Sequence, residues 1–244
     1  MAERIQKVLA RMGLGSRREI ERWIEQGLVE VDGVIAKLGQ TDEGVSQVVV
    51  DGKTVTLKQE VTTQFLQYHK PDDEICSRKD PEGRKTVFDH LPKLSEGRWI
   101  AVGRLDLTTS GILLFTTNGE FANTLLHPSA EVDREYMVRV HGHVTPEVIY
   151  KLREGVKLDD GVARFTDFLA RPSKSANSWV QVVLQEGRNH EVKRMFESEG
   201  LEVTRLIRIR FGPIPLDNNL KKGQSRLLTN KEVKALNALV RQAK

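Results

Sequence analysis

The sequence predicts an α+β protein with a small N-terminal domain, residues 1–60, and a larger domain, residues 61–244. Three observations indicate this fold class. Apolar residues near the N-terminus recur with helical spacing, Asp-Gly pairs mark hairpin turns, and beyond residue 64 strand-like runs outnumber helical ones. This succession favours two helices with short strands, followed by a largely antiparallel or mixed sheet flanked by helices.

The N-terminal segment predicts two helices separated by a short break. Helical spacing in the first is carried by Ile5, Val8, Leu9 and Met12. Ser16 and Glu19 form a capping box for the second helix, and Gly27 suits its end. That helix is expected to bury Ile20, Trp23 and Ile24. Hairpin turns are expected next, at residues 32–33 and 51–52.

The larger domain is expected to follow a polar linker at residues 57–64. Alternating side chains predict a strand in REYMVRVHGHV that points Tyr136, Val138 and Val140 to one face. The same pattern in RLIRIRFG directs Arg208 and Arg210 away from its apolar residues. Helices are expected in 116–128, capped by Thr117, and in 228–240, capped by a Thr229/Glu232 box.

Composition narrows the function classes. Of 244 residues, 39% are apolar and 30% are charged, which is typical of a soluble globular protein. No apolar run is long enough to span a bilayer, and the N-terminus does not resemble a secretory signal. Cys76 is the single cysteine, so an internal disulfide and a cysteine-based zinc site are excluded. We expect a cytoplasmic monomer with no metal, no cofactor and no membrane partner, since phosphate-loop and dinucleotide motifs are absent.

Basic side chains gather in places suited to nucleic acid, although the net charge is only +4. Candidates for RNA contact in the first sixty residues are Lys7, Arg11, Arg17 and Arg18. Arg208 and Arg210 belong to a basic stretch at 203–226, and Arg84 stands in the turn-rich DPEGRKTV. Bases at a helix start favour phosphate binding, but a solvated helix face explains the same pattern.

Asp106 stands between Leu105 and Leu107, just before the apolar run ILLF. A buried carboxylate is costly unless it is paired or hydrogen-bonded, so this position needs a reason. One reading is a turn cap that uses the neighbouring hydroxyl residues. The other is a functional carboxylate.

Four segments resemble known families. Residues 3–50 resemble the S4 RNA-binding domain, and GRLDLTTSG at 103–111 resembles the signature of the RNA pseudouridine synthases. REYMV and EGRNHEVKRMF resemble two further motifs of that family, in the expected order. The resemblance implies that Asp106 is catalytic, that Tyr136 is the family's tyrosine, and that Lys193, after the aliphatic Val192, pairs with the aspartate. It also implies that Arg104 fills the gap left by a flipped nucleotide.

Within the family, residues 68–92 and 97–106 resemble the branch that carries an S4 domain and modifies large-subunit ribosomal RNA. The resemblance therefore implies ribosomal RNA as the partner, with small-subunit RNA as an alternative. One departure is visible. Relatives commonly have K-P-x-G where this chain has Asp73, which lacks the backbone freedom of glycine and puts the shape of that loop in question.

The implied reaction breaks the bond between uracil N1 and ribose and rejoins the base through C5, so it needs no cofactor. Asp106 would add to C1′, take a proton from C2′, or stabilise an oxocarbenium-like state. A cation such as Lys193 would keep the carboxylate ionised in an apolar pocket. Tyr136 offers a ring for stacking and a phenol for proton removal.

Two other function classes fit part of the pattern. A non-catalytic RNA-binding or ribosome-assembly factor would also use an S4 domain, although Asp106, Tyr136 and Lys193 argue against it. A glycoside hydrolase would need a second acid, and no motif supplies one.

Overall fold

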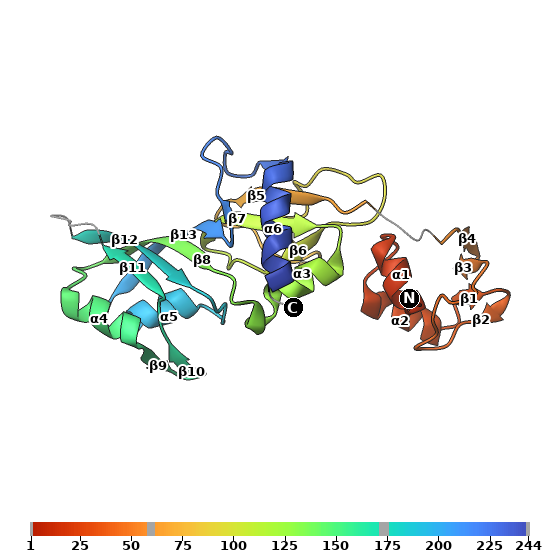
Figure 1. Ribbon diagram of the computed structural model, residues 1–244, viewed down its shortest axis with the longest axis horizontal. Helices are drawn as coiled ribbons and strands as arrows, with labels where there is room; N and C mark the ends of the chain where they lie inside the picture. The colour runs from red at the N-terminus through yellow and green to blue at the C-terminus, as the bar shows by residue number, and fades with distance from the viewer. Residues whose placement is uncertain (1, 58–61, 171–175, 243–244) are drawn as a thin grey trace. The chain divides into compact units, whose positions relative to one another are not determined.

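The protein is described here by a computed structural model that covers residues 2–57, 62–170 and 176–242. These residues form two compact units (Figure 1). The first holds the described residues of 1–64 together with 92–100 and 117–119. The second holds 65–91, 101–116 and the described residues of 120–244. Helices and strands are mixed, which confirms the α+β class.

The first unit begins with two helices, α1 (Ile5–Arg11) and α2 (Arg17–Glu25). The predicted capping box is confirmed: Ser16 Oγ accepts from Glu19 N at 3.1 Å, and the Glu19 carboxylate accepts from Ser16 N. A sheet follows with the order β2-β1-β3-β4. Its strands are β1 (Val29–Val31), β2 (Val34–Ile35), β3 (Val48–Val50) and β4 (Lys53–Val55). Asp32 and Asp51 have positive φ, as hairpin turns with Asp-Gly require.

The core of the first unit lies between its helices and its sheet. Fully buried residues there include Ile5, Leu9, Ile20, Val29 and Val48. Leu57 packs against this core, so the first residue of the predicted linker is a packing residue. Residues 58–61 of that linker lie outside the described residues.

The second unit is built on a mixed sheet with the order β11-β12-β8-β13-β7-β5-β15. Its strands are β5 (Phe65–Lys70), β7 (Thr109–Thr116), β8 (Arg134–His141), β11 (Asp167–Ala170), β12 (Asn177–Leu184), β13 (Glu202–Phe211) and β15 (Ser225–Leu227). Strand β6 (Ile100–Val102) pairs with β7, and β14 (Ile214–Pro215) pairs with β13. A separate hairpin joins β9 (Val156–Leu158) to β10 (Gly161–Ala163). Strands β7 and β13 run parallel, whereas β5/β7, β8/β12 and β8/β13 are antiparallel.

Helices complete the unit: α3 (Gly119–Leu126), η1 (Pro128–Ala130), α4 (Pro146–Glu154), α5 (Glu191–Glu197) and α6 (Asn230–Gln242). Helix α5 packs against β13 and β9, and α4 packs against β11 (Figure 1). The Thr229/Glu232 box of α6 is confirmed. Thr117 was predicted to cap α3, but its hydroxyl instead accepts a hydrogen bond from Gln64 N and donates one to Thr62 O. No helix in the described part of the chain is long and apolar enough to cross a membrane.

Strands β7 and β13 approach each other closely at Gly111. This residue has φ +110°, and a Cβ atom there would lie only 2.6 Å from Arg208 N. Every position of β7 is buried, so this contact lies at the centre of the sheet. Glycine is required because any side chain would push the two strands apart.

Strand β13 differs from the prediction at Arg208. The register of β13 against β8 shifts between Arg208 and Arg210, which breaks the regular alternation of faces. Arg208 is buried, with only 2% of its surface exposed, and Arg210 is half-buried. The prediction that the two arginines share one exposed face is therefore wrong, because Arg208 is buried. Contact of either arginine with RNA stays a prediction.

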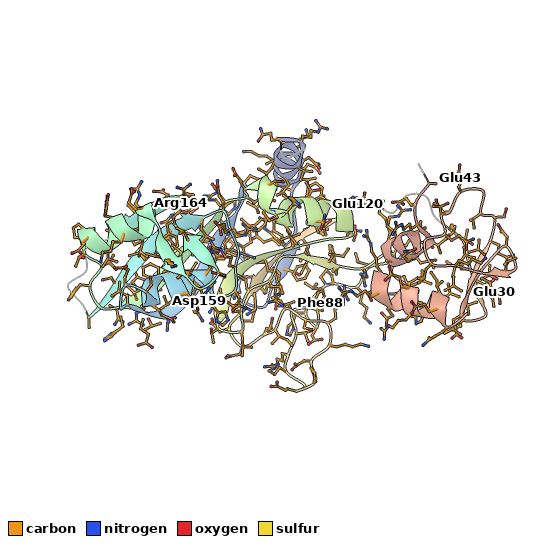
Figure 2. All side chains as sticks on the ribbon, turned by 90° about the horizontal axis from the view of Figure 1, so that it is seen from below. Glu30, Glu43, Phe88, Glu120, Asp159 and Arg164 are labelled. Atoms are coloured by element: carbon orange, nitrogen blue, oxygen red, sulfur yellow. The ribbon has the colours of Figure 1, made fainter. Side chains whose placement is uncertain are left out.

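Phe88 and Asp73 both help to hold the long loop after β5. Phe88, labelled in Figure 2, packs edge-on against Phe115 with ring centroids 5.5 Å apart. Asp73 adopts φ +69°, the left-handed conformation that glycine favours, and its N–H donates to Leu107 O at 2.9 Å. Aspartate tolerates this region better than most residues, so the loop keeps a glycine-like turn despite the substitution.

Candidate active site

A cavity of about 760 Å³ opens in the second unit. Of the residues predicted from the sequence, Arg104, Asp106, Tyr136, Val192 and Arg208 line it. They come from the segment before β7, from β8, from α5 and from β13. The fold thus brings together three motifs that lie far apart in the sequence.

The backbone around Asp106 is fixed by a buried lysine on β5. Lys70 Nζ donates to the carbonyl oxygens of Asp106 (3.1 Å), Leu107 (3.3 Å), Thr109 (2.9 Å) and Pro71 (3.0 Å). Lys70 has no exposed surface, and burial lowers the pKa of its ammonium group. Carbonyl dipoles therefore solvate this cation in place of water and hold the segment that carries Asp106.

The carboxylate of Asp106 is half-buried, and its ionic neighbour is a histidine. His190 Nε2 lies 3.5 Å from Asp106 Oδ1. His190 precedes α5 with φ 48°, and its side chain makes no capping hydrogen bond to the helix. The ring instead faces the cavity, which both residues line.

Lys193 contacts the same segment, but not the carboxylate. Its Nζ donates to Thr108 Oγ1 at 2.6 Å, and no ion pair within 4 Å joins Lys193 to Asp106 in the described residues. His190 lies directly before α5 and Lys193 lies within it. The histidine reaches the carboxylate of Asp106, and the lysine reaches Thr108. The structure thus differs from the predicted direct pair.

Tyr136 is buried on β8, on the same face as Val138 and Val140, as predicted. Arg134, two residues earlier, is also buried and lines the cavity. Its Nη1 donates to Val132 O at 3.0 Å and to Gln185 O. Burial lowers the pKa of Arg134. The tyrosine thus lies beside a guanidinium group that is held by backbone carbonyls.

Arg208 faces Tyr136 across the β8–β13 pairing. Its Nε donates to Ile112 O at 2.9 Å, and its guanidinium lies over the Phe211 ring, 5.3 Å from the centroid. Its Nη2 is buried without a hydrogen-bond partner among the described residues. Two arginines and a tyrosine therefore surround one part of the cavity.

Family models match both parts of the chain. The S4 domain model matches residues 3–41, and the RNA pseudouridylate synthase model matches residues 64–198, more than half of the chain. The chain belongs to the RNA pseudouridylate synthase family. The resemblance found in the sequence motifs is confirmed.

Curated relatives carry a more specific name. Ribosomal large subunit pseudouridine synthase B of Pseudomonas aeruginosa is 50% identical over 97% of this chain, which spans 62% of that relative's length. The protein of the same name from Vibrio cholerae is 52% identical over 98% of this chain, which spans 76% of that relative's length. The one from Escherichia coli K12 is also 52% identical, over 91% of this chain, which spans 78% of its length. A crystal structure of a pseudouridylate synthase matches with a TM-score of 0.66 and 27% identity, over 96% of this chain and 99% of that one.

A salt-bridge cluster holds the rim of the cavity in this family member. Arg188 and Arg194 both bind Asp160, with Nη1–Oδ1 at 3.2 Å and Nη2–Oδ2 at 2.8 Å. The two arginines hold the pKa of Asp160 at about 2. Glu191 is buried beside them and accepts from Arg188 N at 3.0 Å, and burial raises its pKa. The cluster ties the β9–β10 hairpin to the start of α5.

Several predicted RNA contacts are already paired with acids. Arg84 binds Asp80 through two hydrogen bonds, and Arg210 binds Glu135 and Asp133. Lys7 and Arg11 both pair with Glu3. Arg17 and Arg18, at the start of α2, are exposed, as is Arg104 on the cavity wall. The exposed arginines are therefore better placed than the paired ones to meet phosphate.

Three residues of the site were not predicted from the sequence. His190 lies inside the EGRNHEVKRMF motif, but its approach to Asp106 depends on the left-handed turn before α5. Lys70 precedes a proline in the YHKP segment, which gives no sign of burial. Arg134 begins a strand whose alternation places it on the face of Tyr136, and that pattern alone would have found it. Among the described residues, no group of three or more His, Cys, Asp or Glu side chains is arranged to hold a metal ion.

Proposed function

We propose that this chain converts a uridine of large-subunit ribosomal RNA to pseudouridine. The observation that carries the proposal is the cavity that combines the half-buried carboxylate of Asp106 with the buried ring of Tyr136. The names of the relatives, which are 50–52% identical to this chain, support the choice of large-subunit RNA.

In the proposed mechanism, Asp106 acts at the ribose of a flipped uridine. Lys70 holds the Asp106 backbone, so the carboxylate is positioned before the substrate arrives. Tyr136 stacks on the uracil, and its phenol takes part in removing the C5 proton. The whole reaction is an isomerisation, because the base leaves and returns to the same sugar.

Two basic side chains support the carboxylate in this proposal. His190 faces it directly, and Lys193 binds Thr108 two residues away. His190 directly precedes α5, and Lys193 lies within it. The salt bridges from Arg188 and Arg194 to Asp160 hold this helix, so they help to position both residues.

RNA binding is assigned to exposed cations in each unit. Arg104 is exposed on the cavity wall and is suited to stack where the uridine has left the helix. Arg17 and Arg18 form the start of α2, where helix N–H groups also attract phosphate. The monomeric state and the cytoplasmic location stay predictions.

The test uses the purified chain with large-subunit and small-subunit rRNA transcripts that carry tritium at uridine C5. Release of tritium from the large-subunit RNA, with loss of release in Asp106→Asn, is the expected result. Release from small-subunit RNA alone would reassign the substrate. RNA binding without any release would instead identify a binding or assembly factor.

A further inference from the structure

We propose that Arg208 stabilises the uracil base while it is detached from the ribose, through a hydrogen bond from Nη2 to a uracil carbonyl oxygen. This inference rests on the proposed function, because it assigns a catalytic role at the same cavity. It concerns the departing base, whereas Asp106 is assigned to the sugar.

The first observation is that Arg208 is buried and that one of its hydrogen-bond donors, Nη2, has no partner among the described residues. Arg208 Nε is used by Ile112 O, but Nη2 has no partner among the described residues. Since the residue is only 2% exposed, water does not readily replace that partner. An unpaired charged donor in such a place is unfavourable in the free protein, and a bound carbonyl oxygen would satisfy it.

The second observation is that no carboxylate neutralises this guanidinium. Within the described residues, no ion pair of 4 Å or less involves Arg208, whereas Arg188, Arg194 and Arg210 all bind acids. The Phe211 ring fixes the guanidinium from one side at 5.3 Å. A rigid, unneutralised cation in a site shielded from water interacts strongly with developing negative charge.

The third observation is its position relative to Tyr136. The two residues are direct partners across β8 and β13, and both line the cavity. Gly111 allows the backbone of Arg208 to lie against β7. A uracil that stacks on the tyrosine ring would therefore lie in the part of the cavity that Arg208 also lines.

The isomerisation places negative charge on the uracil, which a cation would stabilise. When the C1′–N1 bond breaks, its electron pair passes to the uracil ring and spreads over N1 and the carbonyl oxygens. The ring then uses an electron pair to form the C1′–C5 bond, C5 loses its proton, and N1 gains one. No external reactant is consumed. A cation at a carbonyl oxygen lowers the energy of the intermediate between the two bonds, so it accelerates bond cleavage.

The experiment compares RNA that carries uridine with RNA that carries 5-fluorouridine at the target position, under single-turnover conditions. Loss of the original nucleoside is measured for both, since fluorine at C5 prevents tritium release. Fluorine itself stabilises the uracil anion. In Arg208→Lys and Arg208→Met, we expect about a 100-fold slower reaction of uridine but at most about a tenfold slower reaction of 5-fluorouridine. RNA affinity is expected to stay near that of the wild type.

Two control variants separate this role from packing. Leu152→Ala removes a fully buried side chain of α4 that does not line the cavity, and Arg153→Met removes an exposed charge from the same helix. Both should leave the ratio of the two rates unchanged. Equal loss with both substrates in the Arg208 variants, or wild-type rates in Arg208→Met, would overturn the proposal.

A measurement on the wild type tests the proposal even if the Arg208 variants do not fold. In a structure of the wild-type chain with the 5-fluorouridine RNA, a uracil oxygen is expected within hydrogen-bond distance of Arg208 Nη2. A base seated elsewhere would refute the role of Arg208 but not the proposed function. A wild-type chain that converts neither RNA would refute both.

Discussion

Lys193 Nζ binds Thr108 Oγ1, and His190 Nε2 lies beside the Asp106 carboxylate. The sequence motif identified α5 as the source of positive charge but placed it on Lys193 alone. The motif could not reveal which side chain reaches the carboxylate, because that depends on the left-handed backbone at His190.

The role of Lys193 is testable through its one observed partner. We expect Lys193→Met to lower the single-turnover rate about 100-fold, because positive charge near Asp106 is lost. Thr108→Val, which removes only the acceptor, should cost about tenfold. Lys193 is partly exposed, so the free energy of unfolding should change by less than about 1 kcal/mol. Rates are measured by tritium release, and near-normal turnover in Lys193→Met would refute this role.

At the scale of elements, strands and helices were largely readable from the sequence. Helical spacing, the Ser16 capping box and the Asp-Gly turns depend on neighbours in the chain, so local patterns predicted them. Arg208 shows where such patterns fail. Arg208 is buried while Arg210 is half-buried, and between them the register of β13 against β8 shifts, which depends on a strand distant in the sequence.

The close approach of β7 and β13 predicts a large effect at Gly111. Gly111→Ala combines a positive φ with a Cβ only 2.6 Å from Arg208 N, so we expect a loss of roughly 3 kcal/mol in the free energy of unfolding. Gly200→Ala is the matched control, since Gly200 has φ +72° with nothing within 4 Å of the added Cβ. It should cost only about 1 kcal/mol. Urea denaturation measures both, and equal losses would contradict steric crowding at Gly111.

The start of α6 predicts a pH dependence. Arg226 holds the pKa of Glu232 at about 2 through hydrogen bonds of 2.7 and 2.9 Å, helped by Thr229 N. A pKa lowered by folding adds stability above the ordinary carboxyl pKa, and this stability is lost as the pH falls toward 2. Glu232→Gln should therefore cost about 1 kcal/mol at neutral pH and less in acid.

Urea unfolding at about pH 7 and at about pH 3 measures this difference. Glu154→Gln, at the exposed end of α4, serves as the control and should show no comparable change between the two values. A Glu232→Gln penalty that is the same at both values would show that the ion pair contributes nothing to stability.

At the scale of the whole molecule, an S4 domain followed by a synthase domain was predicted correctly from the sequence. It did not show that residues 92–100 and 117–119 group with the first unit, because those contacts are remote in sequence. The RNA-binding residues were also only partly readable. In the sequence, Lys7 and Arg11 are as good candidates for RNA contact as Arg17 and Arg18. Only the structure shows that Lys7 and Arg11 already pair with Glu3.

Binding by the S4 domain is testable through the exposed arginines. The double variant Arg17→Gln/Arg18→Gln should bind rRNA about tenfold more weakly at about 0.1 M salt, because two phosphate contacts are lost. The slope of log affinity against log salt should become shallower by roughly 1.4 to 1.8, the value for two phosphate contacts. Lys53→Gln, an exposed charge on β4, is the control and should bind as the wild type does. An unchanged salt slope in the double variant would show that these arginines do not meet phosphate.

One ammonium group that binds four carbonyl oxygens has a consequence for dynamics. For residues 106–109 to unfold locally, several hydrogen bonds to Lys70 must break at once. The buried Lys70 ammonium group would then lose the carbonyl oxygens that solvate it. We expect amide hydrogens there to exchange with deuterium as slowly as those of β5, even with no RNA present. Rapid exchange in this segment would mean that the substrate, and not the fold, gives the aspartate its final geometry.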